Sequence, residues 1–376
     1  MTLTKQKIGF QHVGSFLRPN GLKQARKAYE DGFFTQKDLT EIEDEAIKDL
    51  IIKEKEVGLK YVTDGEFRRS YWHLDFFWGF EGVEHIHYGE GYHFAHEETR
   101  DDTARLSGKI SFNPITHPFI RDFDFVKSVA DSVGGVLPKQ TIPAPSQLYI
   151  ELIRGENLKT VNEFYPNHQD LLDDIVSAYH DAIIALYDEG ARVIQLDDCS
   201  WGLFLDDAFL KTEDGQAYLN SGIQDTLLAL NNGAIRGLPD DLTINTHVCR
   251  GNYHSDFAFS GGYAPVAETL FAKENVNSYF LEYDSKRAGG FEPLAKVSGD
   301  KNVVLGLLTT KSGKLENRQD IIDRVNEASQ YIPLDRLWLS TQCGFASTEE
   351  GNILTEEQQW KKLKLVKSII DEIWGP

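Results

Sequence analysis

A histidine and a cysteine stand two residues apart at the end of an apolar stretch in the middle of the chain. The stretch covers residues 242–249, is rich in β-branched residues and is predicted to be a buried strand. In a strand, His247 and Cys249 project from the same face. An imidazole and a thiolate on one face make up half of a tetrahedral zinc site.

Two further candidate ligands follow other strand-like runs, Glu282 after Phe280-Leu and Cys343 after Ser340-Thr-Gln. Two thiolates, one imidazole and one carboxylate suit Zn²⁺ better than Ca²⁺ or Mg²⁺, which prefer oxygen ligands. A carboxylate among soft ligands is easily displaced, and the sequence has no paired C-x-x-C knuckles, so the predicted site is catalytic rather than structural. The alternative is a core histidine with two inert thiols.

Such a zinc site favours chemistry on sulfur. A free thiol has a pKa of about 8.5 and is mostly protonated at neutral pH. Coordination to zinc deprotonates the thiol and holds it as a nucleophile. The residues therefore favour alkylation of a substrate thiol, with activation of water for hydrolysis as the second choice.

Polar residues also end other strand-like runs. Glu66 and Asp197 are candidates for holding a substrate ammonium group, and the alternative for both is a salt bridge to a neighbouring arginine or lysine. The backbone at Gly14 and Ser15 is suited to a carboxylate, because glycine allows a ligand to approach closely. An α-amino acid with a thiol side chain would satisfy the metal site, the carboxylates and this backbone together.

Eight apolar runs that are predicted to be strands position these residues: 8–16, 61–66, 140–148, 192–198, 242–249, 278–285, 302–310 and 337–345. Amphipathic stretches at 39–57, 170–189, 320–331 and 356–373 are predicted to be helices. The alternation predicts a parallel sheet, and eight repeats predict an α/β fold of the (β/α)8 TIM-barrel type. A doubly wound open sheet is the alternative. Active sites of such barrels lie at the C-terminal ends of the strands, where the candidate residues stand.

Residues 68–139 interrupt this pattern and are predicted to be an insertion after the second strand. They contain an aromatic-rich loop at 71–78, a strand-like run at 105–112 and four histidines, His85, His87, His93 and His96. We expect a hairpin or lid over the barrel mouth, in a chain that otherwise forms one domain over residues 1–376. The histidines are a possible metal site, but the surrounding Glu and Gly residues favour a solvated loop.

The composition narrows the classes of partner. The 376 residues are 41% hydrophobic and 26% charged, as in a globular protein with a large core. A net charge of -20 argues against nucleic acids and anionic membranes. With no apolar segment long enough for a signal sequence or a membrane span, we expect a cytoplasmic protein. Three cysteines predict no disulfide framework, and Cys199 is interpreted as a small buried hydrophobe.

Together the motifs resemble the C-terminal catalytic domain of cobalamin-independent methionine synthase, here as a stand-alone domain. The matching segments are Thr246-His-Val-Cys, Leu281-Glu-Tyr-Asp-Ser-Lys-Arg, Ile332-Pro-Leu-Asp-Arg-Leu-Trp-Leu-Ser-Thr-Gln-Cys-Gly, Val193-Ile-Gln-Leu-Asp-Asp and His12-Val-Gly-Ser-Phe. The resemblance implies a (β/α)8 barrel with zinc bound by His247, Cys249, Glu282 and Cys343. It also implies methyl transfer from 5-methyltetrahydrofolate to homocysteine, which would be bound by Gly14, Ser15, Glu66 and Asp197.

The residues that would bind the methyl donor depart from the family pattern. Where the family places a histidine after the seventh strand, this sequence reads Thr309-Thr-Lys-Ser-Gly, so the acid is missing or replaced by Lys311. A polyglutamate tail on the donor conflicts with the net charge of -20. The identity of the donor stays open. Two alternatives to the function also stay open: alkylation of another thiol such as coenzyme M, and a non-catalytic zinc-binding barrel. The candidates for stacking a flat donor, or for core packing, are Trp72, Trp78, Tyr149 and Trp201.

Overall fold

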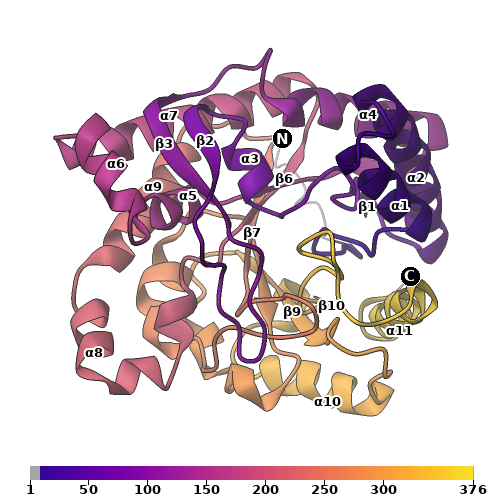
Figure 1. Ribbon diagram of the computed structural model, residues 1–376. Coiled ribbons are helices and arrows are strands. Elements are labelled where there is room, and N and C mark those ends of the chain that lie inside the picture. Colours follow the sequence, from indigo (N-terminus) through magenta and orange to yellow (C-terminus); the bar gives the residue numbers. More distant parts are fainter. Residues whose placement is uncertain (1–8, 376) are drawn as a thin grey trace.

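Parallel strands form the centre of the protein and helices surround them in the computed structural model, which describes residues 9–375 (Figure 1). The largest sheet has six parallel strands in the order β10-β9-β8-β7-β6-β5. These strands are β5 (Gln140–Pro143), β6 (Val193–Asp197), β7 (Thr243–Val248), β8 (Ser278–Glu282), β9 (Asn302–Leu308) and β10 (Leu337–Thr341). Nearly all of their residues are buried, as expected for a parallel sheet that is covered on both faces.

Short elements continue this arrangement beyond β5. The two-residue strand β1 (Tyr61–Val62) pairs in parallel with β4 (Leu137–Pro138), which ends two residues before β5 begins. The amide of Phe16 donates to the carbonyl of Gly65, and the amide of Phe345 donates to the carbonyl of Ser15. The segment at 15–16 therefore lies between the chain that follows β1 and the loop that follows β10.

The α-helices of the described residues flank the strands in the chain and mostly lie outside them (Figure 1). They are α1 (Asn20–Glu30), α2 (Gln36–Val57), α3 (Leu74–Phe77), α4 (Pro118–Val133), α5 (Pro145–Ile153), α6 (Asn157–Phe164), α7 (His168–Asp188), α8 (Glu213–Leu219), α9 (Ile223–Ala234), α10 (Arg318–Ala328) and α11 (Glu356–Trp374). Thr35 and Thr355 begin α2 and α11 with capping boxes, which satisfy amides at the helix start. Between residues 9 and 375, no helix is both long and apolar enough to cross a membrane.

The predicted elements agree best with the structure in the second half of the chain. The four predicted helices correspond to α2, α7, α10 and α11, and the five runs from 192–198 to 337–345 correspond to β6–β10. Each of these strands ends before its predicted end, because the last residues of each run turn into the loops that carry the candidate site. The run at 140–148 is wrong beyond Pro143, since α5 begins at Pro145, and proline is well suited to the first position of a helix.

The first two predicted strands are shorter than expected. The run at 8–16 forms only an isolated bridge between Gln11 and Tyr61 in the described part of the chain, and Ile8 lies outside that part. The run at 61–66 ends as β1 at Val62, and Gly65 and Glu66 take left-handed backbone conformations with φ of 63° and 61°. Such conformations interrupt the extended backbone that a strand requires.

The fold class is mixed α/β with a parallel sheet, as predicted. Strand order follows the chain from β5 to β10 without reversal, which excludes the doubly wound alternative, where the order reverses at a switch point. A continuous cluster of buried apolar side chains runs from Phe10 to Ile370. Closure of eight strands into a barrel stays a prediction.

Residues 68–139 contain an antiparallel hairpin of β2 (Glu81–His87) and β3 (Asp102–Ser111). Its connection, residues 88–101, crosses in front of the central strands in the view of Figure 1. There the amide of Ala95 donates to the carbonyl of Phe257 in the loop after β7, and the amide of His96 donates to Asp256. The hairpin is therefore present and anchored to a distant loop, and its action as a lid stays a prediction.

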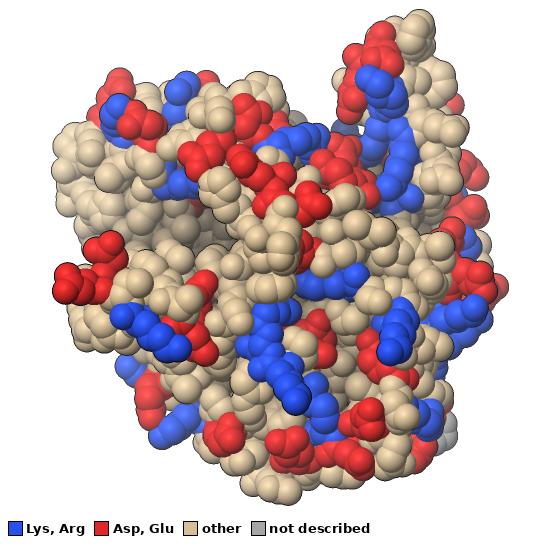
Figure 2. Space-filling view, turned by 60° about the horizontal axis from the view of Figure 1, so that its bottom comes forward, with Lys and Arg blue, Asp and Glu red and all other residues tan. Residues whose placement is uncertain are grey.

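Charged side chains of both signs are interspersed on the face shown in Figure 2. The whole chain carries a net charge of -20. Interspersed charges of both signs are typical of a solvent-exposed protein surface. The expectation that nucleic acids and membranes are not partners stays a prediction.

Candidate metal centre and substrate cavity

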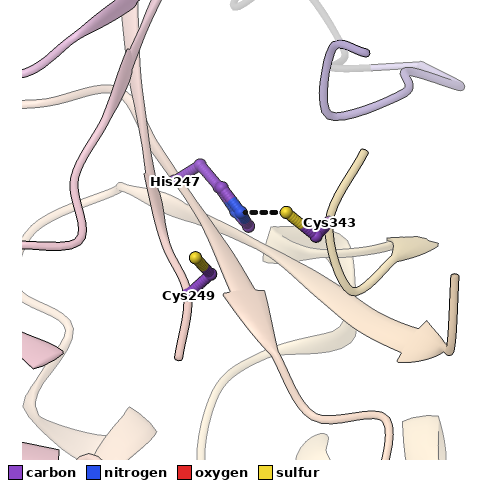
Figure 3. Close-up of side chains that lie close together, drawn as sticks. All are labelled: His247, Cys249 and Cys343. Atoms are coloured by element: carbon purple, nitrogen blue, oxygen red, sulfur yellow. Dashed lines mark hydrogen bonds between the residues drawn. The ribbon is translucent and has the colours of Figure 1, made fainter. Parts of the chain in front are cut away.

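Three of the four predicted metal ligands lie together (Figure 3). His247 is the next-to-last residue of β7, Cys249 follows β7 directly, and Cys343 lies two residues past β10. Their ligand atoms all lie within 4.8 Å of one another, and all three residues are buried. Nε2 of His247 is 3.4 Å from Sγ of Cys343, although the two residues are 96 positions apart. The edge of the parallel sheet therefore brings these distant side chains to one point.

The ring of His247 is oriented by its second nitrogen. Nδ1 lies 3.0 Å from the carbonyl oxygen of Phe280 in β8. Since a carbonyl oxygen only accepts, Nδ1 carries a hydrogen, and Nε2 faces the thiols. Metal-binding histidines usually donate their other ring N–H in this way. The ring is thus oriented as a metal ligand would be. Burial acts to lower the pKa of His247, but hydrogen bonding to Cys249 raises it overall.

The thiols favour the charge state that binds a metal. Hydrogen bonds from the thiols of Cys199 and Cys343 lower the pKa of Cys249 well below its usual range. The same hydrogen bonds, together with burial, raise the pKa of Cys199 and of Cys343. A thiolate is therefore stabilised at Cys249, beside the imidazole. One imidazole with sulfur ligands is a donor set that Zn²⁺ fits.

Glu282, the fourth predicted ligand, ends β8 but has other partners. Oε1 accepts a hydrogen bond from the Arg287 guanidinium at 2.5 Å, and Oε2 accepts one from the backbone amide of Arg250 at 2.9 Å. Burial acts to raise the pKa of Glu282, but the cations Lys311, Arg287 and Arg250 lower it overall. Glu282 is not in the three-residue group that the described residues form, so its role as a ligand stays a prediction.

The three-residue group opens into a cavity of about 600 Å³. Ser15, Glu66 and Asp197 line the same cavity as His247 and Cys343. Gly14 lies behind this lining, where a Cβ would stand 3.0 Å from Oε1 of Glu66. Gly14 therefore makes room for the Glu66 carboxylate. The cavity joins the predicted metal ligands to the residues predicted to bind an amino acid.

Glu66 presents one free carboxylate oxygen. Its Oε1 accepts from the hydroxyl of Thr141 at 3.0 Å and lies 3.5 Å from Nη1 of Arg69. Its Oε2 is buried and has no hydrogen-bond partner among the described residues. The salt-bridge alternative therefore accounts for only one of the two oxygens. A buried carboxylate oxygen without a donor is costly, which suits a site that receives an ammonium group.

Asp197 ends β6 near Lys139, a buried cation that the sequence did not indicate as a site residue. Burial raises the pKa of Asp197 and lowers that of Lys139, while the opposite charge of each partner acts against these shifts. Lys139 donates to the carbonyl of His12 at 2.6 Å. The sequence feature that could have indicated Lys139 is its position directly before the apolar run at 140–148.

Ser15 lies where the two ends of the chain meet. Its hydroxyl accepts from the amide of Ala346 at 3.2 Å, and a side chain at Gly344 would collide with it. Buried Arg18 donates to the carbonyls of Ala346 and Glu66 at 2.5 and 2.6 Å. The loop that carries Cys343 is therefore tied to the N-terminal part of the chain.

The outer wall of the cavity comes largely from the predicted insertion. Its contribution includes Tyr71, Trp72, His73, Tyr88, Tyr92 and Phe94. Of the four aromatic residues considered for stacking, Trp72 lines the cavity, whereas Trp201 and Tyr149 belong to the buried core. The fourth, Trp78, donates its indole N–H to the carbonyl of Thr103 outside the lining. Of the four predicted stacking candidates, only Trp72 therefore lines the cavity.

The four histidines of the insertion pair with carboxylates. His85 and His87 lie near Asp102 and form a second group of possible ligands, but both histidines are exposed. His93 pairs with Glu90, and His96 pairs with Asp256. These contacts at exposed histidines agree with the solvated-loop interpretation.

Lys311 and Cys199 lie near the group formed by His247, Cys249 and Cys343, and the sequence did not determine the role of either residue. Nζ of Lys311 donates to Oδ1 of Asn252 at 3.2 Å, and its charge acts on Glu282 and Cys343, but Lys311 does not line the cavity. The interpretation of Cys199 as a small hydrophobe is wrong. Cys199 lines the cavity, and its Sγ is 3.1 Å from that of Cys249.

Comparisons with known proteins identify the family of the chain. A family model described as the catalytic domain of cobalamin-independent synthases matches residues 157–360. The uncharacterised Bacillus subtilis protein YxjH is 44% identical over 370 residues, which cover 96% of this chain and 94% of YxjH. The chain belongs to the cobalamin-independent methionine synthase family.

Other relatives extend this result. A solved structure from Listeria monocytogenes, provisionally described as a vitamin-B12-independent methionine synthase, is 37% identical with a TM-score of 0.75 and covers 99% of this chain and 100% of its own. A methionine synthase of Saccharolobus solfataricus is 25% identical over 337 residues, covering 88% of this chain and 86% of that protein. A B12-independent methionine synthase from Shewanella, 19% identical with a TM-score of 0.65 over 91% and 90% of the chains, shares the fold. Membership of the cobalamin-independent methionine synthase family confirms the resemblance and supports an enzyme of methyltransferase type.

Proposed function

We propose that this protein transfers a methyl group to the thiolate of homocysteine and so forms methionine. One observation carries the proposal: the cavity that reaches His247, Cys249 and Cys343 is also lined by Glu66 and Asp197. A thiol-bearing amino acid is the substrate class that needs both parts at once. Membership of the family supports methyl transfer as the reaction.

Zn²⁺ is the ion that we propose for this centre. His247, Cys249 and Cys343 would hold it, and Glu282 would join them after releasing Arg287. Bound zinc lowers the pKa of a coordinated thiol, so that the sulfur is a thiolate at neutral pH.

The protein's own residues would position the amino acid. The free Oε2 of Glu66 and the carboxylate of Asp197 would accept hydrogen bonds from the ammonium group. The backbone at Ser15, supported by Gly14 behind the lining, would receive the carboxylate. In the transfer, a bond forms between the substrate sulfur and the methyl carbon. The bond between the methyl carbon and the donor breaks, its electron pair stays on the donor, and the donor takes up a proton.

The donor would occupy the outer half of the cavity. Trp72 offers a flat surface there for a pterin such as that of 5-methyltetrahydrofolate. Glu90 and Glu151 lie on the same wall, and the whole chain carries a charge of -20. We therefore expect a donor without a long polyglutamate tail. We propose that a closed (β/α)8 barrel holds both the metal ligands and the donor wall, with residues 68–139 as its lid.

Transfer of an isotopically labelled methyl group tests this function. Zinc-loaded protein would be incubated with homocysteine and, in turn, with methyl-folate carrying one or several glutamates, a methylated corrinoid protein, or a small methylated sulfur compound. We expect labelled methionine by mass spectrometry and about one zinc per chain. Full activity in metal-free protein, or methylation of coenzyme M in place of homocysteine, would contradict the proposal.

A further inference from the structure

A group of possible metal ligands lies outside the cavity, on the hairpin of β2 and β3. His85, His87 and Asp102 each offer a ligand atom, and these atoms all lie within 4.8 Å of one another. His85 and His87 are two residues apart on β2, so their side chains project from one face of the strand. Asp102 stands directly opposite His87 in the antiparallel register, which places its side chain on the same face. The regular geometry of the hairpin therefore brings the three side chains together.

The carboxylate of Asp102 is oriented toward the two histidines. Its Oδ2 accepts a hydrogen bond from the hydroxyl of Tyr71 at 2.9 Å, and Asp102 is buried. Its Oδ1 lies 2.6 Å from Nε2 of His85 and 3.7 Å from Nδ1 of His87. Ligand atoms bonded to one ion at about 2.0–2.2 Å are at most roughly 4.4 Å apart. Small side-chain rotations would therefore be enough to place one ion among the three residues.

The surroundings of the histidines favour a bound cation. The ring of His85 packs against the ring of Trp78, with 4.1 Å between the centroids, and outer contacts that fix a ligand usually raise metal affinity. Asp101 lies 3.1 Å from Nδ1 of His87 and adds negative charge. The side chains of His85 and His87 are 44% and 71% exposed, so water can fill the remaining positions on the ion. Solvent exposure of these histidines is therefore compatible with metal binding.

The three residues also stand at the two ends of a segment that forms part of the outer cavity wall. β2 ends at His87 and β3 begins at Asp102, so the connection 88–101 starts and finishes beside the group (Figure 1). This connection contributes Tyr88, Tyr92 and Phe94 to the cavity lining. An ion that joins the two ends of a loop restricts the conformations of the loop between them.

We propose that His85, His87 and Asp102 bind a second divalent transition-metal ion, of the Zn²⁺ type, which fastens the two ends of the connection 88–101. Two imidazoles and one carboxylate suit such an ion better than Ca²⁺ or Mg²⁺, which prefer oxygen ligands. With three protein ligands and no sulfur, the site is expected to release its ion on desalting, so that purified protein keeps only the zinc of the sulfur centre. The hairpin site does not depend on the proposed function.

Cobalt binding tests the site on the whole chain after its sulfur centre has been filled with zinc. Calorimetric titration should show one further Co²⁺ per chain, with weak visible absorption and without the intense near-ultraviolet absorption of cobalt–thiolate bonds. Tyr71→Phe should weaken this binding by the roughly 10- to 100-fold that loss of an outer partner costs, and His87→Gln should weaken it more. The matched controls His93→Gln and His96→Gln lie in the connection and should bind Co²⁺ like the wild type.

A Cys343→Ser variant separates this site from the sulfur centre. It should keep the thiolate-free Co²⁺ with wild-type affinity, so a failure of the proposed methyl transfer or of the sulfur centre leaves the result unchanged. Absence of a thiolate-free Co²⁺ in the wild type would overturn the proposal. Equal Co²⁺ affinity of His87→Gln and the wild type would also overturn it.

Hydrogen–deuterium exchange tests whether the ion fastens the connection. Added Co²⁺ should slow amide exchange severalfold in residues 88–101 of the wild type, because the ion opposes local opening of the segment. The same addition should leave exchange in His87→Gln unchanged. Equal exchange of residues 88–101 with and without Co²⁺ in the wild type would overturn the fastening role.

Discussion

The inner and outer halves of the cavity are built in different ways. The inner half takes Asp197, His247 and Cys343 from the edge of one parallel sheet, and all three are buried. The outer half comes largely from residues 71–99, from α5 and from the loop after β7, and contacts such as that between Ala95 and Phe257 join the first and the last of these. A hydrogen-bonded sheet fixes side-chain positions, whereas loops tolerate change. On the proposed function, we therefore expect the metal chemistry to depend on the sheet edge and the choice of donor to depend on the loops.

The largest expected effect is in the inner half. Cys343→Ser removes a thiolate ligand, so we expect the variant to lose its zinc and its kcat/KM for methionine formation to fall by on the order of 1,000-fold or more. Elemental analysis and transfer of labelled methyl groups measure both. The matched control is Phe94→Leu in the outer wall, which should keep its zinc. A Cys343→Ser variant with wild-type zinc content would show that the cluster is not the metal site.

Glu66→Gln should change the KM for homocysteine without changing the KM for the donor. Removing the charge that faces the ammonium group should raise KM for homocysteine about 10- to 100-fold, the range for a hydrogen bond to a charged group. The value of kcat and the KM for the donor should change little, because the reacting sulfur is elsewhere. Steady-state kinetics with each substrate varied in turn measures this. Glu151→Gln in the outer half is the control, and an equal rise in the homocysteine KM there would contradict the division of roles.

Behind the inner half, Glu274 accepts a hydrogen bond from Asn231 at 3.0 Å, and burial raises its pKa to about 8. A carboxyl whose pKa is higher in the folded state is favoured there when protonated, so stability falls as pH rises from its unfolded value to about 8. We expect Glu274→Gln to match the wild type at pH about 4 and to exceed its free energy of unfolding by on the order of 2 kcal/mol at pH about 9.

Denaturant unfolding at the two pH values measures this difference. The control is Glu327→Gln on the exposed face of α10, which should show the same pH dependence as the wild type. A constant difference between Glu274→Gln and the wild type at all pH values would mean that the carboxyl is already ionised when buried.

The smallest expected effect is in the outer half. Trp72→Ala removes the one stacking candidate that lines the cavity, so KM for a flat donor should rise about tenfold, a typical value for an aromatic contact. Zinc content and the KM for homocysteine should stay at wild-type values. Trp78→Leu, outside the cavity lining, is the control. A donor KM that is unaffected by Trp72→Ala would place the donor against another part of the wall.

The inner half was largely predictable from the sequence because its residues end strands. Parallel strands end at a common edge, so His247, Cys249 and Cys343 could be expected together from three separate runs. The charged partner of Glu282 could not be predicted in the same way. Arg287 lies in the loop after β8, and the sequence does not determine which nearby cation turns toward the carboxylate.

The outer half was predictable only as an insertion with a hairpin. That Trp72 faces the cavity while Trp78 packs elsewhere depends on contacts between segments far apart in the chain. Cys199 was misread for a related reason. The rule that singled out Asp197 applies to residues at strand ends, whereas Cys199 lies in the following loop, where the course of the backbone depends on the bonds of Asp198.

Arg18 bears on how the protein acquires its metal during synthesis. Its guanidinium shapes the segment after Cys343 through the carbonyl of Ala346, 328 positions away. A nascent chain that has already folded β7 holds His247 and Cys249 but lacks the other sulfur and the loop that presents it. If the proposed metal centre is correct, we expect stable metal binding to require the chain through the loop that presents Cys343 and the N-terminal segment that carries Arg18.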